Sequence, residues 1–213
     1  MSSELSTKDI LYEIIELSYD ILIKKLGHGS LKALNEASFQ LEFGHILKTL
    51  GNLYEFDLED KFYLEFETPF KLKEDSFKSK TKKARIDLFI RYQSNGEEVK
   101  AAIELKFFKK SNHREPNNRY DVFQDLKNLE DYKDNDIDIC YFILATDHKH
   151  YCYQDTYSAD TADFDFRHEK EYQAGKILKY STTKPYGEEV SLKNNYKFEW
   201  TTIKNLNFLK LKI

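Results

Sequence analysis

The stretch Ala84–Lys109, ARIDLFIRYQSNGEEVKAAIELKFFK, decides the expected fold. Asn95-Gly96 separates two runs rich in Ile, Leu, Val and Phe. This dipeptide is the strongest short-range hairpin signal, because a type I′ turn needs positive φ at both central residues. The stretch therefore predicts two antiparallel strands joined by a two-residue turn, with Ser94 facing Glu97.

This register sorts the side chains of the hairpin onto two faces. Asp87 falls opposite Glu104, and Arg85 falls opposite Lys106, all on one face. The other face is apolar, as a strand pair that packs on a core requires. It carries Ile86, Leu88 and Ile90 from the first strand and Ile103, Leu105 and Phe107 from the second.

The polar face carries a pattern typical of phosphoryl chemistry. Two carboxylates at one cross-strand position repel each other, so they need a compensating cation. Mg²⁺ or Mn²⁺ supplies one, because hard divalent ions take carboxylate oxygens. Lys106 can then position or help deprotonate the attacking water and stabilise the charge that builds on a phosphate. The alternative is a solvated outer face on which Asp87, Glu104 and Lys106 only balance one another.

Asp87, followed by Glu104-Leu105-Lys106 on the next strand, resembles the pattern of the PD-(D/E)XK nuclease superfamily, which has the restriction-endonuclease-like fold. Ile86 stands where the family's name has proline. The resemblance covers residues 35–145. It implies that Asp87, Glu104 and the carbonyl of Leu105 hold Mg²⁺ (or Mn²⁺), and that Lys106 handles the water.

Members of this superfamily often carry a further metal-directed Glu on the helix before the sheet. The sequence predicts such a helix from Asn35 to about Leu50, stopped by Gly51. On its helical wheel Glu36 lies at the edge of the apolar stripe, whereas Glu42 lies on the opposite flank. The wheel therefore favours Glu36 as the outer-shell or second-metal ligand. The alternative is a carboxylate that only suits the helix dipole.

The other periodic segments complete an αβββαβ order. This order predicts an α/β restriction-endonuclease-like core with a mixed central sheet flanked by helices, within one domain spanning residues 1–213 and with an N-terminal helix and a C-terminal strand extension. The segments are a helix that begins at a capping box of Ser6 and Asp9 and ends at Gly27, a helix over 118–133, strands over 61–70 and 139–145, and in the tail a helix over 166–179 and strands over 196–203 and 208–213.

A basic run suggests where a nucleic acid would bind. The chain has a net charge of −4 and a pI near 5.9, so nothing global indicates DNA binding. The segment 71–85, KLKEDSFKSKTKKAR, nevertheless abuts the proposed metal site, and Lys and Arg clusters supply phosphate contacts. A solvated loop is the alternative. The candidate DNA contacts are Lys80, Lys82, Lys83, Arg85 and Lys109.

Two further groups of polar residues receive no catalytic role. On the helix over 118–133, Asp125 borders the apolar stripe and Gln124 points away from it. His148, His150 and Cys152 alternate after the strand at 139–145, with His168 further on, but zinc needs four ligands at suitable spacing and no paired second half of such a site follows.

The expected function is a metal-dependent endonuclease that hydrolyses DNA phosphodiester bonds. The alternatives are a catalytically inactive DNA-binding or assembly protein on the same fold, and a non-nuclease metal enzyme. The 213 residues, 40% of them hydrophobic, suit one domain. Two cysteines and the lack of an apolar run of transmembrane length favour the cytoplasm and no membrane partner. DNA is the expected partner, with a homodimer left open.

Overall fold

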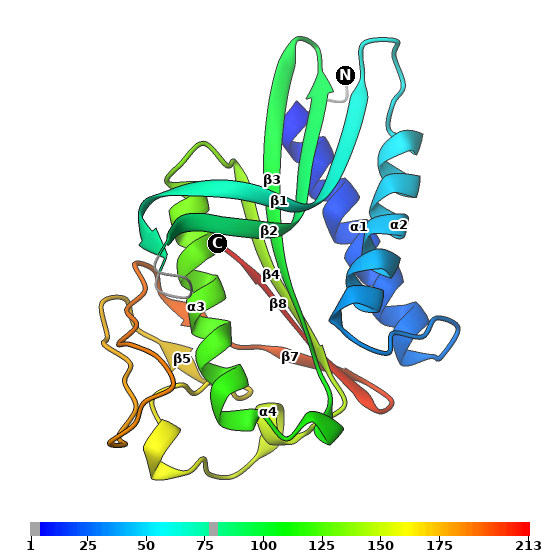
Figure 1. Cartoon of the computed structure of the whole chain (residues 1–213). Coiled ribbons are helices and arrows are strands. Elements are labelled where there is room, and N and C mark those ends of the chain that lie inside the picture. The colour runs from blue at the N-terminus through cyan, green and yellow to red at the C-terminus, as the bar shows by residue number, and fades with distance from the viewer. Residues whose placement is uncertain (1–4, 77–80) are drawn as a thin grey trace.

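The computed structural model describes residues 5–76 and 81–213, with side chains described outside 72–83. In this part of the chain a six-stranded mixed sheet has the order β1-β2-β3-β4-β8-β7 (Figure 1). The β3 and β4 strands are parallel, and every other neighbouring pair is antiparallel. The strands are β1 (Lys61–Ser76), β2 (Thr81–Ser94), β3 (Glu97–Phe108), β4 (Ile139–Thr146), β7 (Trp200–Ile203) and β8 (Leu206–Lys212).

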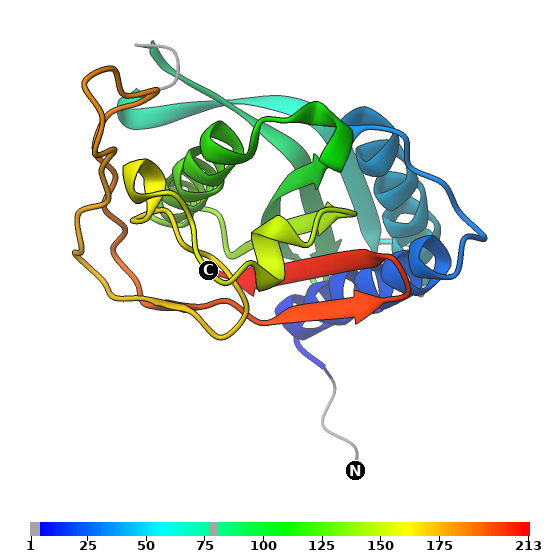
Figure 2. The ribbon, with the colours of Figure 1, turned by 90° about the horizontal axis from the view of Figure 1, so that it is seen from below.

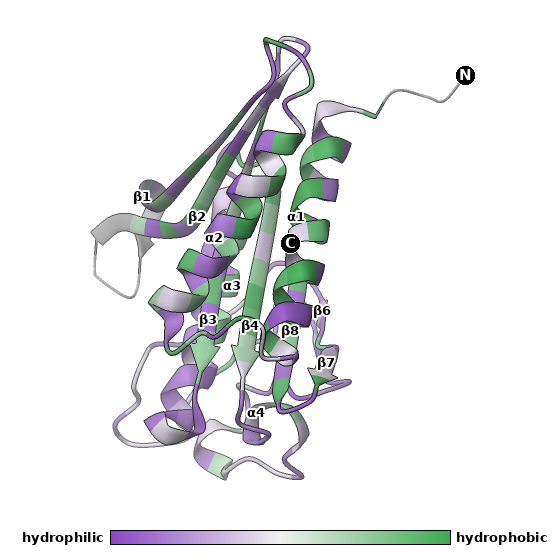
Figure 3. Ribbon diagram, turned by 90° about the vertical axis from the view of Figure 1, so that its right-hand side faces the viewer, coloured by the Kyte–Doolittle hydropathy of each residue, from purple (hydrophilic) through white to green (hydrophobic). Residues whose placement is uncertain are grey.

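Helices cover both faces of this sheet, which makes the fold α/β (Figure 2). Helices α1 (Thr7–Gly27) and α2 (Glu36–Leu53) pack on one face, and α3 (Glu115–Lys133) packs on the other. Between the two layers β4 is buried along its whole length and is apolar almost throughout (Figure 3), as expected for a central strand. None of the described helices has the length and apolarity to cross a bilayer.

The ends of the first two helices follow the sequence signals, with one exception. Ser6 caps α1 by accepting the N–H of Asp9, and Asn35 caps α2 by accepting the N–H of Ser38. Gly51 was expected to stop α2, but the helix continues to Leu53. A Cβ atom at Gly51 would lie 2.3 Å from the ring of Phe62. This glycine therefore allows α2 to lie against β1 rather than ending the helix.

The predicted hairpin register is confirmed near the turn, but the expected pairs of Asp87 with Glu104 and of Arg85 with Lys106 lie beyond the last paired residues of β2 and β3. Ser94 pairs with Glu97, and the same register continues to Leu88 and Ile103. Asn95 and Gly96 have φ values of 53° and 76°, as a type I′ turn requires.

On the N-terminal side of Leu88, β2 is no longer paired with β3, and the β1–β2 hairpin bends away from it. Glu67 lies at the bend with φ 53°, between residues that pair normally with β2. The outer part of the hairpin then crosses α3 (Figure 1), where the ring of Phe70 packs 4.9 Å from that of Tyr132. Outside residues 77–80 the basic run 71–85, for which a solvated loop was the alternative to a DNA-contact segment, lies in strands β1 and β2. The bend also moves Ile86 into the core on the α3 side, and the expectation that it packs with Leu88 and Leu105 was wrong.

The tail adds antiparallel strands to the sheet, as predicted, but the helix expected over 166–179 is absent. In its place the chain forms β5 (Glu171–Tyr172), which pairs with β6 (Tyr196–Lys197) in a two-stranded sheet, and a short helix, α4 (His150–Tyr153), precedes this segment. Its backbone bonds to distant segments: Glu169 N–H donates to Phe198 and Leu178 N–H to Val190. These long-range bonds replace the local ones a helix would make.

Candidate functional site

Lys106 on β3 is the centre of the site. Its Nζ lies 3.0 Å from Asp125 Oδ2 and 3.7 Å from Glu36 Oε1, and it donates a hydrogen bond of 3.0 Å to the carbonyl of Leu105. Only 13% of its side chain is exposed. Burial acts to lower the pKa of Lys106, but four carboxylates outweigh it and hold the pKa well above the usual value: those of Asp125, Glu36, Asp87 and Glu104.

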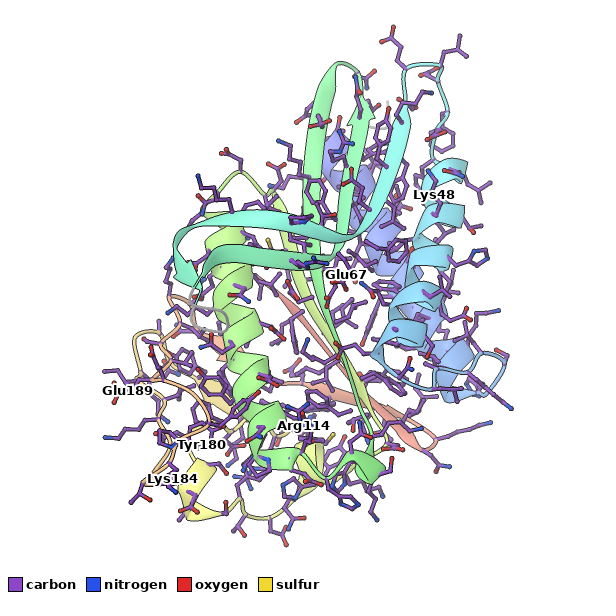
Figure 4. The ribbon with its side chains drawn as sticks, viewed as in Figure 1. Lys48, Glu67, Arg114, Tyr180, Lys184 and Glu189 are labelled. Atoms are coloured by element: carbon purple, nitrogen blue, oxygen red, sulfur yellow. The ribbon has the colours of Figure 1, made fainter. Side chains whose placement is uncertain are left out.

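Asp87 lies where the β1–β2 hairpin bends. Its Oδ2 accepts the N–H of Leu105 at 2.7 Å, and its own carbonyl accepts a hydrogen bond of 2.7 Å from Gln40 Nε2. Gln40 also reaches Glu67, which Figure 4 shows at the bend. Burial raises the pKa of Asp87 to about 6, against the lowering effects of Lys106 and of the Leu105 N–H.

Glu104 lies deeper, under α3, and is 4% exposed. Its Oε1 accepts a hydrogen bond of 3.1 Å from the hydroxyl of Tyr132. Burial and this carboxylate both raise the pKa of Tyr132, so the phenol stays protonated and can donate the hydrogen bond to Glu104. The ring of Tyr132 packs on Phe70 of β1, so the outer part of the β1–β2 hairpin also helps to position the tyrosine that bonds Glu104.

Glu36 opens α2 and points back at the sheet. Its Oε2 accepts the N–H of Phe107 at 3.4 Å, and its other oxygen faces Lys106. This position agrees with the choice of Glu36 over Glu42. The structure thus brings together all four side chains that the sequence selected as catalytic.

A cavity of about 440 Å³ opens at the carboxyl end of β3, between the first turns of α2 and α3. Its lining includes Glu36, Lys106, Lys109, Arg114, Asn118 and Asp121. Figure 4 shows Arg114 near the start of α3. Asp87 and Glu104 are outside this lining, so Lys106 and Glu36 connect the buried carboxylates to the cavity.

The predicted DNA contacts are mostly elsewhere. Among the residues that line this cavity, Lys109 is the one member of that group. Arg85 is exposed on β2, paired with Pro69. Lys80 lies outside the described residues, and so do the side chains of Lys82 and Lys83.

Sequence reasoning missed Asp125, which is 2% exposed and gives Lys106 its shortest ion pair. It also missed Tyr132. A signal was present, because Asn118, Asp125 and Tyr132 recur every seven residues and so share one face of α3. Gln124 was expected to point away from the core, but it is 3% exposed. That expectation was wrong because the tail covers the side of α3 that the wheel left open to solvent.

The donor set suits a hard divalent cation. Four carboxylates surround one ammonium, so the cluster has an excess of negative charge and of oxygen ligands. Within the described residues no group of three or more His, Cys, Asp or Glu side chains has the arrangement of a metal site. Mg²⁺, however, commonly binds through one or two carboxylates and keeps several waters, so two carboxylates such as those of Asp87 and Glu104 would be enough in number.

The residues weighed for zinc have other partners. His148 bonds Glu115 at 2.9 Å, His168 Nδ1 accepts the N–H of Trp200, and Cys152 is buried.

No family model, curated protein or solved structure matches this chain. What the site can do therefore follows from its own residues.

Proposed function

We propose that this protein is a Mg²⁺-dependent endonuclease of restriction-endonuclease-like fold that hydrolyses DNA phosphodiester bonds. One observation carries the proposal: a buried ammonium, Lys106, is held among the carboxylates of Glu36, Asp87, Glu104 and Asp125 at the floor of an open cavity. A structural ion pair needs one carboxylate for one ammonium. Burial, with smaller contributions from the carboxylates of Asp125 and Glu36, raises the pKa of Asp87, and a perturbed carboxyl of this kind is common at functional sites.

The arrangement of elements supports the finer description of the fold. Helix α2, strands β1 to β3, helix α3 and strand β4 follow one another in the order αβββαβ. Asp87 lies on the second of these strands, Glu104 and Lys106 on the third, and Glu36 on the preceding helix. These positions agree with the family pattern that the sequence resembles.

Each residue has a defined task in this proposal. Asp87 and Glu104, with the carbonyl of Leu105, would hold the cation, and Glu36 would act from its outer shell. The bound cation would supply positive charge that stabilises the phosphate as negative charge builds on it. Lys106 borders the cavity, so its ammonium can orient the attacking water and donate to a phosphate oxygen. Arg114 and Lys109 on the cavity rim can hold the flanking phosphates.

A second candidate, a DNA-binding or assembly protein without cleavage, has its own supporting observation. Lys106 is paired with Asp125, and Glu104 is bonded to Tyr132, each in a buried position. A buried ion-pair network with satisfied partners can serve the structure alone.

Plasmid cleavage in Mg²⁺ distinguishes the two candidates. The parent should nick or linearise supercoiled DNA in Mg²⁺ and Mn²⁺, whereas Ca²⁺ should bind yet support little turnover. Asp87→Asn should weaken Mn²⁺ binding in titration calorimetry. Lys106→Ala should leave that binding nearly intact and raise the barrier by about 2–4 kcal/mol. DNA binding with no cleavage by the parent in either metal would favour the second candidate.

A further inference from the structure

A second cavity, of about 450 Å³, lies after β4, the parallel neighbour of β3. Its lining is Lys110, Asp147, His148, Lys149, His150, Gln154 and Asn205. Lys109 lines the first cavity and Lys110 lines the second, so consecutive residues of the chain line the two cavities. Both lie at the carboxyl ends of parallel strands, the usual place for ligands in α/β sheets.

The acidic groups at this second cavity are already engaged. Asp147 Oδ1 accepts the backbone N–H of Lys110 at 2.7 Å, and Glu115 Oε1 bonds His148 Nε2 at 2.9 Å. The side chains of Lys110 and Lys149 are exposed. The lining of this cavity therefore presents two ammonium groups and two imidazoles against one carboxylate, that of Asp147, which already has a partner.

A buried cation, Arg119, lies close to this cavity without lining it. Arg119 is 1% exposed, and its Nε and Nη1 have no hydrogen-bond partner among the described residues. Its guanidinium lies 3.6 Å from the ring centroid of Tyr157, and that ring lies 5.2 Å from His150 in the cavity lining. Arginine stays charged in proteins, and the ring of Tyr157 lies between Arg119 and the cavity residue His150. Arg119 therefore adds a fixed positive potential that favours an anion in the cavity.

We propose that the cavity after β4 binds a backbone phosphate of the DNA strand whose neighbouring phosphate enters the cavity at Lys106. This inference rests on the proposed function and assigns the path of the substrate. The strand would run across the ends of β3 and β4, past Lys109 and Lys110, instead of along the basic β1–β2 hairpin. The two cavities are lined by five Lys and Arg side chains, whereas the chain as a whole has a net charge of −4.

The test compares two double variants that remove the same charge. Lys110→Ala/Lys149→Ala empties the cavity of its ammonium groups, and Lys176→Ala/Lys184→Ala removes two exposed lysines of the tail as the matched control. DNA binding is measured by fluorescence anisotropy in Ca²⁺ over a range of salt concentrations. Each lost phosphate contact should weaken binding about tenfold at 0.1 M salt and reduce the log–log salt slope by roughly 0.9. The control should bind like the parent.

Cleavage assays separate this inference from the proposed function. The Lys110→Ala/Lys149→Ala variant should cut a dinucleotide at the parent's rate, since so short a substrate cannot span both cavities, and should cut subsaturating plasmid more slowly. If the parent cleaves DNA but this variant binds and cuts plasmid like the control, the path is wrong and the nuclease stands. An equal loss of binding in both double variants would also overturn the path. Failure of the parent to bind DNA would overturn both proposals.

Discussion

The carboxylate of Asp87 accepts the backbone N–H of Leu105 at 2.7 Å, just beyond the last paired residues of β2 and β3. The ladder between these strands ends at Leu88 and Ile103 because β2 bends away. The side chain of Asp87 then takes the N–H that the backbone of β2 no longer reaches. A buried N–H without a hydrogen-bond partner destabilises the folded state. The bond to Asp87 satisfies the N–H of Leu105 and also holds the carboxylate near Lys106.

The raised pKa of Asp87 predicts a specific pH dependence. Because its pKa rises from 3.8 to about 6 on folding, the folded state binds the proton more tightly than the unfolded state. Asp87 therefore lowers the free energy of unfolding as the pH rises through this window, by about 1–3 kcal/mol once partial solvent exposure is allowed for.

We expect Asp87→Asn to be more stable than the parent at pH 7 and equal to it near pH 4, because asparagine can still accept the Leu105 N–H. Urea denaturation at the two pH values checks this, and Asp20→Asn on the exposed side of α1 is the control. Adding Mg²⁺ should stabilise the parent and the Asp20→Asn control more than it stabilises Asp87→Asn. An Asp87→Asn variant that gains from Mg²⁺ as much as the parent does would remove Asp87 from the metal site.

A double-mutant cycle on Lys106 and Asp125 tests the charge balance. Lys106→Met should cost about 3–5 kcal/mol, because it leaves the surrounding carboxylates without their cation. Asp125→Asn should cost less, since other carboxylates still face Lys106. In the double variant one of the uncompensated charges is gone, so it should be more stable than Lys106→Met alone, with a coupling of roughly 0.5–3 kcal/mol.

Thermal and urea unfolding of the four proteins measure this cycle. The exposed Lys8→Met serves as the control for replacing a lysine by methionine. Additive single effects would show that the two side chains, although 3.0 Å apart, are energetically independent.

Tyr132→Phe should destabilise the protein by about 1.5–3 kcal/mol, because it leaves the buried carboxylate of Glu104 without the hydroxyl that bonds it. Tyr63→Phe, at a ring that is 41% exposed, should change the free energy of unfolding little. Urea denaturation of both variants makes the comparison. Equal effects of the two substitutions would mean that the Tyr132 bond contributes nothing beyond ring packing.

Two glycines of α2 should differ in their tolerance of alanine. A Cβ at Gly51 would lie 2.3 Å from the ring of Phe62, which is 1% exposed and cannot move aside. At Gly44 the Cβ would lie 2.4 Å from the far end of the Phe66 ring, which is 44% exposed and can swing out.

Gly51→Ala should therefore cost about 1–3 kcal/mol through overpacking. Gly44→Ala should be close to neutral, since the helix propensity of alanine, worth about 1 kcal/mol, offsets the adjustment. Thermal unfolding of the two variants tests the order. The reverse order would mean that Phe62, not Phe66, has room to move.

Short-range signals in the sequence were sufficient to predict the features that depend on neighbours along the chain. The Asn95-Gly96 turn fixed the hairpin register, and side-chain alternation then put Glu104 and Lys106 on the same face of β3. The caps at Ser6 and Asn35 fixed two helix starts. Each signal acts over a few residues, through turn geometry or a single capping bond, so tertiary packing did not override it.

Contacts between distant segments set what covers the face of β3 that carries Glu104 and Lys106, and they also set several features around it. The bend at Glu67, the position of Ile86, the burial of Asp125 and the pairing of the tail with distant strands all depend on contacts between segments far apart in sequence. A helical wheel ranks Asp125 at the edge of an apolar stripe but cannot show that Lys106 lies 3.0 Å away. The energy of that ion pair exists only once β3 and α3 have packed, which is why the local pattern could not assign it.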